Sequence, residues 1–379
     1  MKKLLTILGL LMVFIGCKKP FDPPTGVLDN SILVIEGTIA VGNNTENVFK
    51  LSRLRPLQSD PGASLESNAA VNIISSGGST WPVQLSTPGI YRATLNLPEN
   101  DSYKLVVQTQ DGTQYESPLQ QAVLTPEIDS ITWKQPDELN LFVHTHDASN
   151  STRYYRWEYE ETWEYNSWFE ATLDFKDGQI VSRPPEEQVF TCWRSDSSEL
   201  INISNSVALT QDVISYQPLT TITQASSFER NKLAVRYSIL VKQLGLTKEA
   251  YNFWNILKKN TELTGTLFDP QPSKMPSNIK CTNDPGRESI GFISVGKITE
   301  QRVFIRHSAI PLWPLLDESQ TCSKVTMNSI DAPAYLQKDP FYSPVTYVER
   351  TNNQQVYITN KSCMDCTLRG GNNVKPAYW

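Results

Sequence analysis

The chain has 379 residues, a formal net charge of −6 at pH 7 and a hydrophobic fraction of 39%. This length is enough for two domains. The acidic balance argues against a nucleic-acid partner, and 24 prolines, 18 glycines and scattered runs of Val, Ile, Thr and Tyr favour β-structure over a helical bundle.

Residues 1–16 predict a lipoprotein signal peptide. Two lysines precede an apolar stretch at 4–15 that is too short to span a membrane. The stretch Phe14-Ile15-Gly16-Cys17 is similar to a bacterial lipobox, with Phe14 where Leu is usual. We therefore expect lipidation of Cys17, whose acyl chains would anchor the protein in a membrane. A plain secretory signal is the alternative.

Residues 17–30 are rich in proline and predict an extended tether. Residues 31–120 predict a β-sandwich of immunoglobulin or transthyretin type, because short strands alternate with Gly, Ser and Pro turns. The Asp111-Gly112 turn between two such strands is a strong hairpin signal.

Residues 121–379 predict a larger β-rich domain with one inserted α-helix, so the fold class is mainly β. The helix is expected after Thr247, a plausible N-cap. An apolar stripe at helical spacing follows, made of Ala250, Phe253, Trp254 and Leu257.

The stretch 154–165 is the densest in aromatic residues and predicts a strand. Its odd positions are aromatic except for Glu161, and its even positions are mostly charged. A buried carboxylate must be neutral or paired, so we expect Glu161 to meet an Arg, a Lys or backbone amides. A ligand contact is the alternative.

A second strand of the same form covers 232–242. If the two strands share a sheet, Arg236 and Lys242 face Glu158 and Glu160. The possible ligand contacts are Glu161, Arg236 and Tyr154. Tyr154 is included because it is an aromatic residue on the charged face of its strand.

Five cysteines remain besides Cys17. An odd number in an envelope protein predicts two disulfides and one free thiol. A zinc site or a redox pair at 363–366 is the alternative. The candidates are Cys192, Cys281, Cys322, Cys363 and Cys366.

Two residue patterns bear on catalytic or metal chemistry. His144 and His146 share one strand face at a spacing that metals use, but a solvated strand face explains them equally well. The glutamates at 158–164 invite comparison with two-carboxylate hydrolases, although lysine partners and solvent suffice for them. Because the sequence contains no recognisable catalytic motif, we expect no enzyme activity, no cofactor and no metal.

Several motifs together resemble a known family. They are "RYYRWEYEETW", Cys192-Trp193, "YSILVKQ" leading into "EAYNFW", "LFDPQPS" and "CMDCTLRGGNNVKPAYW". The chain resembles the Bacteroidota lipoproteins classed as domain of unknown function 4249, a family without an established activity.

The resemblance implies an outer-membrane lipoprotein that accompanies a TonB-dependent receptor in nutrient uptake and contacts an unknown small ligand. The alternatives are an envelope hydrolase and a structural or adhesive surface protein. The lysines after Cys17 leave open whether the protein faces the periplasm or the cell surface.

Overall fold

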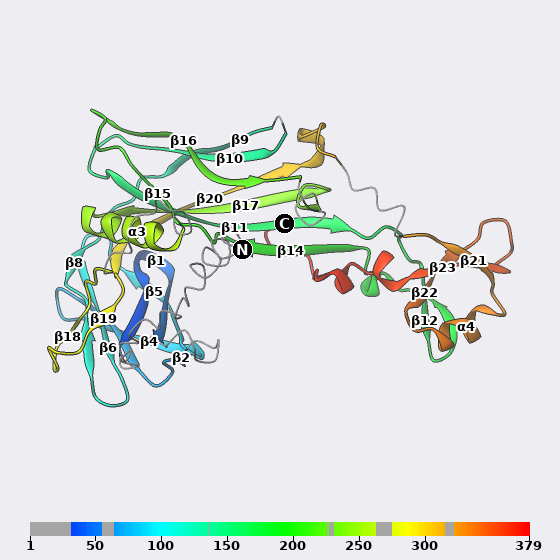
Figure 1. The fold of residues 1–379 in the computed structure, drawn as a ribbon, viewed down its shortest axis with the longest axis horizontal. Helices are drawn as coiled ribbons and strands as arrows, with labels where there is room; N and C mark the ends of the chain where they lie inside the picture. The colour runs from blue at the N-terminus through cyan, green and yellow to red at the C-terminus, as the bar shows by residue number, and fades with distance from the viewer. Residues whose placement is uncertain are drawn as a thin grey trace, which may run out of the picture.

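The computed structural model describes residues 32–54, 64–135, 137–224, 226, 231–262, 275–314 and 322–379. The predicted signal peptide, Cys17 and the tether lie outside these residues. The described chain is mainly β, as the sequence predicts, and has three parts: an N-terminal sandwich, a long central sheet with a second layer, and a C-terminal lobe (Figure 1).

The predicted N-terminal β-sandwich is confirmed. Its strands are β1 (Leu33–Arg53), β2 (Ser64–Leu65), β3 (Ala70–Ser75), β4 (Thr80–Thr87), β5 (Ile90–Leu97), β6 (Ser102–Gln108), β7 (Gln114–Glu116) and β8 (Gln120–Gln121). In β6, Tyr103, Leu105 and Val107 alternate with more exposed residues and are buried, as period-two patterning requires.

A distant segment completes the sandwich. It contributes β18 (Lys280–Cys281), β19 (Ser289–Ile290) and the first residues of β20 (Ser294–Arg306). The sandwich core therefore combines residues 33–122 with Ile279, Cys281, Ile293 and Val295. The predicted boundary after residue 120 does not include this contribution.

The central sheet is continuous with the sandwich. Besides β20, it consists of β11 (Tyr154–Asn166), β14 (Thr191–Ser197), β15 (Asn202–Asn205) and β17 (Arg236–Leu246). Strand β20 joins the two parts, because its residues 294–297 pair in parallel with β1 and its residues 298–306 pair antiparallel with β17. This shared strand fixes the sandwich against one end of the central sheet.

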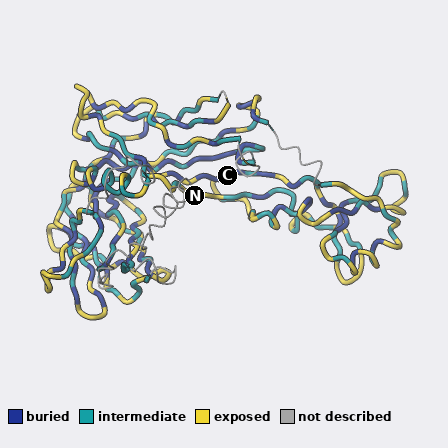
Figure 2. Tube along the Cα trace, in the orientation of Figure 1, coloured by how far each residue is buried: buried dark blue, intermediate teal, exposed yellow. Residues whose placement is uncertain are grey.

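A three-stranded layer covers the aromatic face of the central sheet. It consists of β9 (Ile128–Lys134), β10 (Leu139–Asp147) and β16 (Asp212–Ile222). The odd-numbered residues of β11 from Tyr155 to Tyr165 are buried, as predicted, and five of these six are aromatic. Figure 2 shows the resulting run of buried residues between the layers.

The predicted helix is confirmed as α3 (Lys248–Thr261), and the Ala250 amide donates to the Thr247 hydroxyl over 3.2 Å. The expectation of a single helix is wrong, because the C-terminal lobe contains α4 (Ala332–Lys338). This helix has only seven residues, too few for a helical period to show clearly in the sequence.

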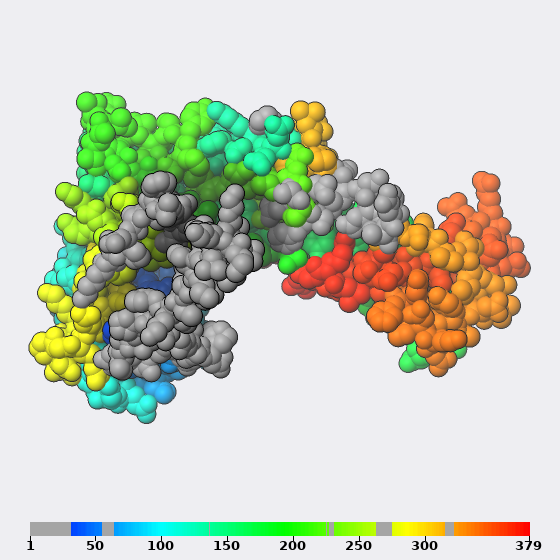
Figure 3. Space-filling view, viewed as in Figure 1, coloured from blue at the N-terminus to red at the C-terminus, as the bar shows by residue number. Residues whose placement is uncertain are grey.

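The C-terminal lobe projects from the far end of the central sheet (Figure 3). Besides α4 it contains β12 (Leu173–Lys176), β13 (Gln179–Ser182), β21 (Val325–Asn328), β22 (Tyr342–Tyr347) and β23 (Gln355–Asn360). Short 3₁₀ turns are η2 (Pro185–Glu187), η3 (His307–Ala309), η4 (Lys361–Cys363) and η5 (Cys366–Arg369). A small apolar core of its own holds the lobe together.

Two disulfides and one free thiol are present, as predicted. Cys192 is bonded to Cys366 and Cys322 to Cys363, while Cys281 is free and buried. The two cysteines at 363 and 366 therefore bond to different partners. In the described part of the chain, no group of three or more His, Cys, Asp or Glu side chains could hold a metal ion.

None of the helices within the described ranges is long and apolar enough to cross a bilayer.

Candidate functional site

Glu161 lies in a buried ion pair. Its side chain is 5% exposed, and its Oε2 atom lies 2.9 Å from Lys232 Nζ. Its Oε1 atom accepts a hydrogen bond from the Tyr237 hydroxyl, and the Lys232 ammonium lies 5.2 Å from the centre of the Trp163 ring. The predicted charged partner is thus a lysine, and the carboxylate has a structural role in the core.

The other two predicted contact residues are also engaged within the protein. The Tyr154 ring packs 5.1 Å from the Tyr251 ring of α3. The Arg236 guanidinium lies 4.1 Å from the centre of the Phe304 ring and 5.2 Å from that of Trp379. In the sheet register Arg236 is opposite Glu164, while Lys242 is opposite Glu158 and forms an ion pair with Glu160.

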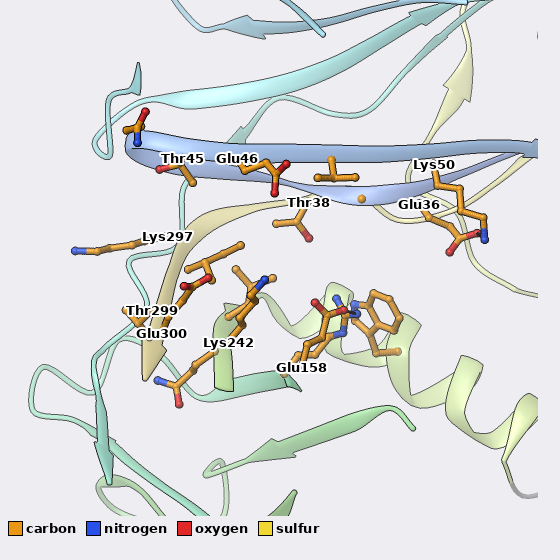
Figure 4. A pocket seen from close by; sticks show the side chains of 18 of the residues that line it. Glu36, Thr38, Thr45, Glu46, Lys50, Glu158, Lys242, Lys297, Thr299 and Glu300 are labelled. Carbon is orange, nitrogen blue, oxygen red and sulfur yellow. Dashed lines mark hydrogen bonds and ion pairs between the residues drawn. The ribbon is translucent and has the colours of Figure 1, made fainter. Parts of the chain in front are cut away.

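A groove lies where the sandwich meets the central sheet. It encloses about 760 Å³. Strand β1 forms one wall, and β11, β17, β20 and α3 form the floor and ends. In Figure 4, Thr38 and Glu46 extend from β1 toward Glu158 and Lys242 on the opposite side. Tyr154, Glu161 and Arg236 do not line it.

Charged side chains of both signs line the groove. The acidic ones are Glu36, Glu46, Glu127, Glu158 and Glu300, and the basic ones are Lys50, Arg156, Lys242 and Lys297. Each of the four basic groups forms an ion pair within the groove or at its rim: Lys50 with Glu36, Arg156 with Glu158, Lys242 with Glu160, and Lys297 with Glu99.

Arg156 and Trp254 stack on each other in the lining of the groove. The Arg156 guanidinium lies 3.6 Å from the centre of the Trp254 ring, and the Arg156 side chain is 16% exposed. Burial lowers the pKa of Arg156, and the negative charges of Glu158 and Glu36 oppose this effect. Because arginine starts from a very high pKa, the group stays a cation.

Lys242 shows the opposite balance. Burial disfavours its charged form, but the hydrogen bond to Glu160 and the charges of Glu160, Glu300 and Glu158 outweigh burial, so the pKa of Lys242 is raised. The groove thus places positive charges beside carboxylate side chains. Such a surface can hydrogen-bond to a polar or zwitterionic ligand, and Trp254 supplies an aromatic surface.

The groove could not be identified from the sequence. Its lining comes from segments as distant as residues 36 and 300, and only the parallel pairing of β1 with β20 brings these segments together. The alternation of charges on 154–164 and 232–242 is a signal for a polar sheet face, but it does not indicate which end the sandwich covers.

The fold and the groove define a β-rich protein with a polar cavity at the junction of its two main parts. The sequence of residues 18–302 matches the model of the family described as "Domain of unknown function (DUF4249)", and the chain belongs to this family. The C-terminal motif "CMDCTLRGGNNVKPAYW" lies beyond the matched residues.

No curated protein matches the chain. Among solved structures, the chain is similar to a segment of two fibronectin type III domains from chicken tenascin, at 10% identity, covering 55% of this chain and 91% of that one, with a TM-score of 0.14. A score this low supports no statement about function.

Proposed function

We propose that the protein is a binding lipoprotein of the outer membrane that accompanies a TonB-dependent receptor in nutrient uptake. The observation that carries the proposal is the groove at the junction of sandwich and central sheet, with its paired charges and Trp254. A site between two parts of a chain is a common location for ligands. In this proposal Cys17 is the lipid anchor and residues 17–30 hold the groove away from the membrane.

Binding is favoured over catalysis by the charge arrangement. The carboxylates of Glu36 and Glu158 are paired with Lys50 and Arg156. A carboxylate that contacts a basic side chain is arranged for charge pairing and hydrogen bonding, whereas acid–base hydrolysis needs two carboxyl groups placed on either side of a scissile bond. The groove therefore supports recognition of a polar ligand better than hydrolysis.

The partnership is tested by affinity capture. The tagged chain is expressed in its native host, the outer membranes are solubilised in mild detergent, and captured proteins are identified by mass spectrometry. We expect a TonB-dependent receptor to be enriched with the natural sequence and lost with Cys17→Ala, which prevents lipidation. Recovery of no receptor with the lipidated protein would contradict the proposal.

A further inference from the structure

The outer face of the layer β9–β10–β16 presents a second group of aromatic side chains, none of which lines the groove. The inner face packs on the central sheet through residues such as Leu141 and Val143. Phe142, His144 and Tyr216 lie on the opposite face, and Tyr216 is 53% exposed.

Two β-bulges occur at the same row of this sheet. Between β10 and β16, Val143 pairs with Gln217 and Thr145 with Ile214, so Ser215 and Tyr216 are both opposite His144. Between β10 and β9, His144 pairs with Ser130 and Thr145 with Ile128, which leaves Asp129 as an extra residue. Each bulge adds a side chain to the outer face around His144.

The bulge in β16 reverses the expected direction of Tyr216. Asp212 and Ile214 are buried on the inner side, and period-two alternation would place Tyr216 there too. Instead Tyr216 has a φ of 54°, in the left-handed region, which is unfavourable for a large side chain. Of the six other non-glycine residues with positive φ in the described ranges, five are Asn or Asp, which tolerate it better.

The surrounding side chains fix the ring of Tyr216. The Tyr216 amide donates to His144 Nδ1 over 3.3 Å, and His144 Nε2 lies 2.8 Å from the Thr132 hydroxyl. The His144 and Phe142 rings contact Tyr216 at centroid distances of 4.7 and 5.8 Å. The exposed Lys134 ammonium lies 4.3 Å from the centre of the Tyr216 ring. We call Thr132, Lys134, Phe142, His144 and Tyr216 the Tyr216 platform.

The platform has the chemistry of a sugar-binding surface. A pyranose ring has an apolar C–H face, which packs on an aromatic ring, and a rim of hydroxyl groups, which needs donors and acceptors. Around Tyr216 the strand register adds neutral hydrogen-bonding side chains on the same face, among them Ser130, Asn140, Ser215 and Thr221. Asp129, at the edge of this face, lies 2.8 Å from His146.

We propose that the Tyr216 platform binds a neutral polysaccharide by stacking a sugar ring on Tyr216, with Lys134 and the neighbouring hydroxyl and amide groups hydrogen-bonding to the sugar. A protein partner fits less well, because the core of a protein interface is apolar and this face is mostly polar beyond its two aromatic rings. The inference is independent of the groove, since it uses other residues on another sheet.

Affinity electrophoresis tests the proposal. The purified chain is run in native gels that contain dextran, pullulan, laminarin, galactomannan or arabinoxylan, and its retardation gives an apparent Kd. We expect at least one polysaccharide to retard the natural protein. Tyr216→Gly should weaken that binding about tenfold or more, as expected for loss of an aromatic anchor, while Tyr216→Phe should retain most of it.

Tyr216→Gly also separates binding from folding. Glycine adopts positive φ without strain, so relief of strain offsets part of the loss of ring contacts, and this variant should remain folded while losing the ring. Tyr335→Ala, at a residue of the C-terminal lobe that is 37% exposed, is the matched control and should bind like the natural protein.

Several results would overturn the proposal. The first is that none of the five polysaccharides retards the natural protein. The second is that Tyr216→Gly binds polysaccharide as the natural protein does. The third is that Tyr216→Gly loses a captured protein partner but not polysaccharide binding. Loss of retardation in Trp254→Ala with Tyr216→Gly unaffected would place the sugar in the groove. A negative result in the native gels does not bear on the receptor capture, which tests the proposed function separately.

Discussion

Lys232 places its ammonium 2.9 Å from the Glu161 carboxylate, and the side chains of both residues are less than 10% exposed. The pair lies within the aromatic core of the central sheet, next to Trp163 and Tyr237. A carboxylate in such surroundings is stable only with its partner in place.

We therefore predict that Glu161→Leu or Lys232→Met alone lowers the free energy of unfolding by about 3–5 kcal/mol, because each leaves a buried charge without its partner. The double variant should recover much of the loss. Urea unfolding followed by tryptophan fluorescence measures these differences. If the single variants were as stable as the natural protein, the pair would have no structural role.

The two disulfides should stabilise different regions. Cys192–Cys366 joins β14 to the C-terminal segment, whereas Cys322–Cys363 lies at the base of the lobe. Loss of a native disulfide costs about 2–5 kcal/mol. Cys192→Ser with Cys366→Ser should increase amide hydrogen exchange in residues 366–379, and Cys322→Ser with Cys363→Ser should increase it in β21–β23. The same exchange pattern in both double variants would contradict this assignment.

Arg156 should hold α3 against the central sheet. Its guanidinium stacks on Trp254, and a stack of this kind contributes about 0.5–2 kcal/mol. Arg156→Ala should increase hydrogen exchange across residues 248–261, and Arg156→Lys should do so to a smaller extent, because it keeps the charge but loses the planar group. Arg92→Ala, which removes an exposed ion pair with Glu46, is the control and should leave that exchange unchanged.

The ion pair at the edge of the Tyr216 platform should depend on pH. The hydrogen bond from His146 to Asp129, and then the charge of Asp129, raise the pKa of His146 above its usual value of 6.5. A raised pKa in the folded state stabilises the protein below the unfolded value, and this contribution is lost as pH rises through the folded pKa. NMR titration should show a lower pKa for His146 in Asp129→Asn. An unchanged value would exclude Asp129 as the cause.

Local structure was predictable where patterning alone decides it. The inward aromatic face of 154–165, the charged partner of Glu161 and the helix after Thr247 all follow from residue periodicity and the energetics of buried charge. Contacts made by distant segments were not predictable. Arg236 is covered by Phe304 and Trp379, and the segment that completes the sandwich comes from residues 279–295.

The position of Tyr216 shows a second limit. Alternation places this residue in the core, and only the bulge opposite His144 turns it outward. Nothing about a tyrosine in the sequence signals a positive φ. The groove was equally unpredictable from the sequence, because its walls meet through the pairing of β1 with β20.

Binding of a small polar ligand in the groove is tested by identifying the molecules that the protein carries when it is purified. The natural chain, Trp254→Ala and the control Trp81→Ala are purified from the native envelope, extracted with organic solvent and analysed by liquid chromatography and mass spectrometry. Trp81 is a half-buried tryptophan of the sandwich, packed against Tyr103. We predict a small molecule that is present in the natural chain and in Trp81→Ala but depleted in Trp254→Ala. Equal amounts in all three proteins, or no bound molecule in the natural chain, would show that the groove does not bind such a ligand.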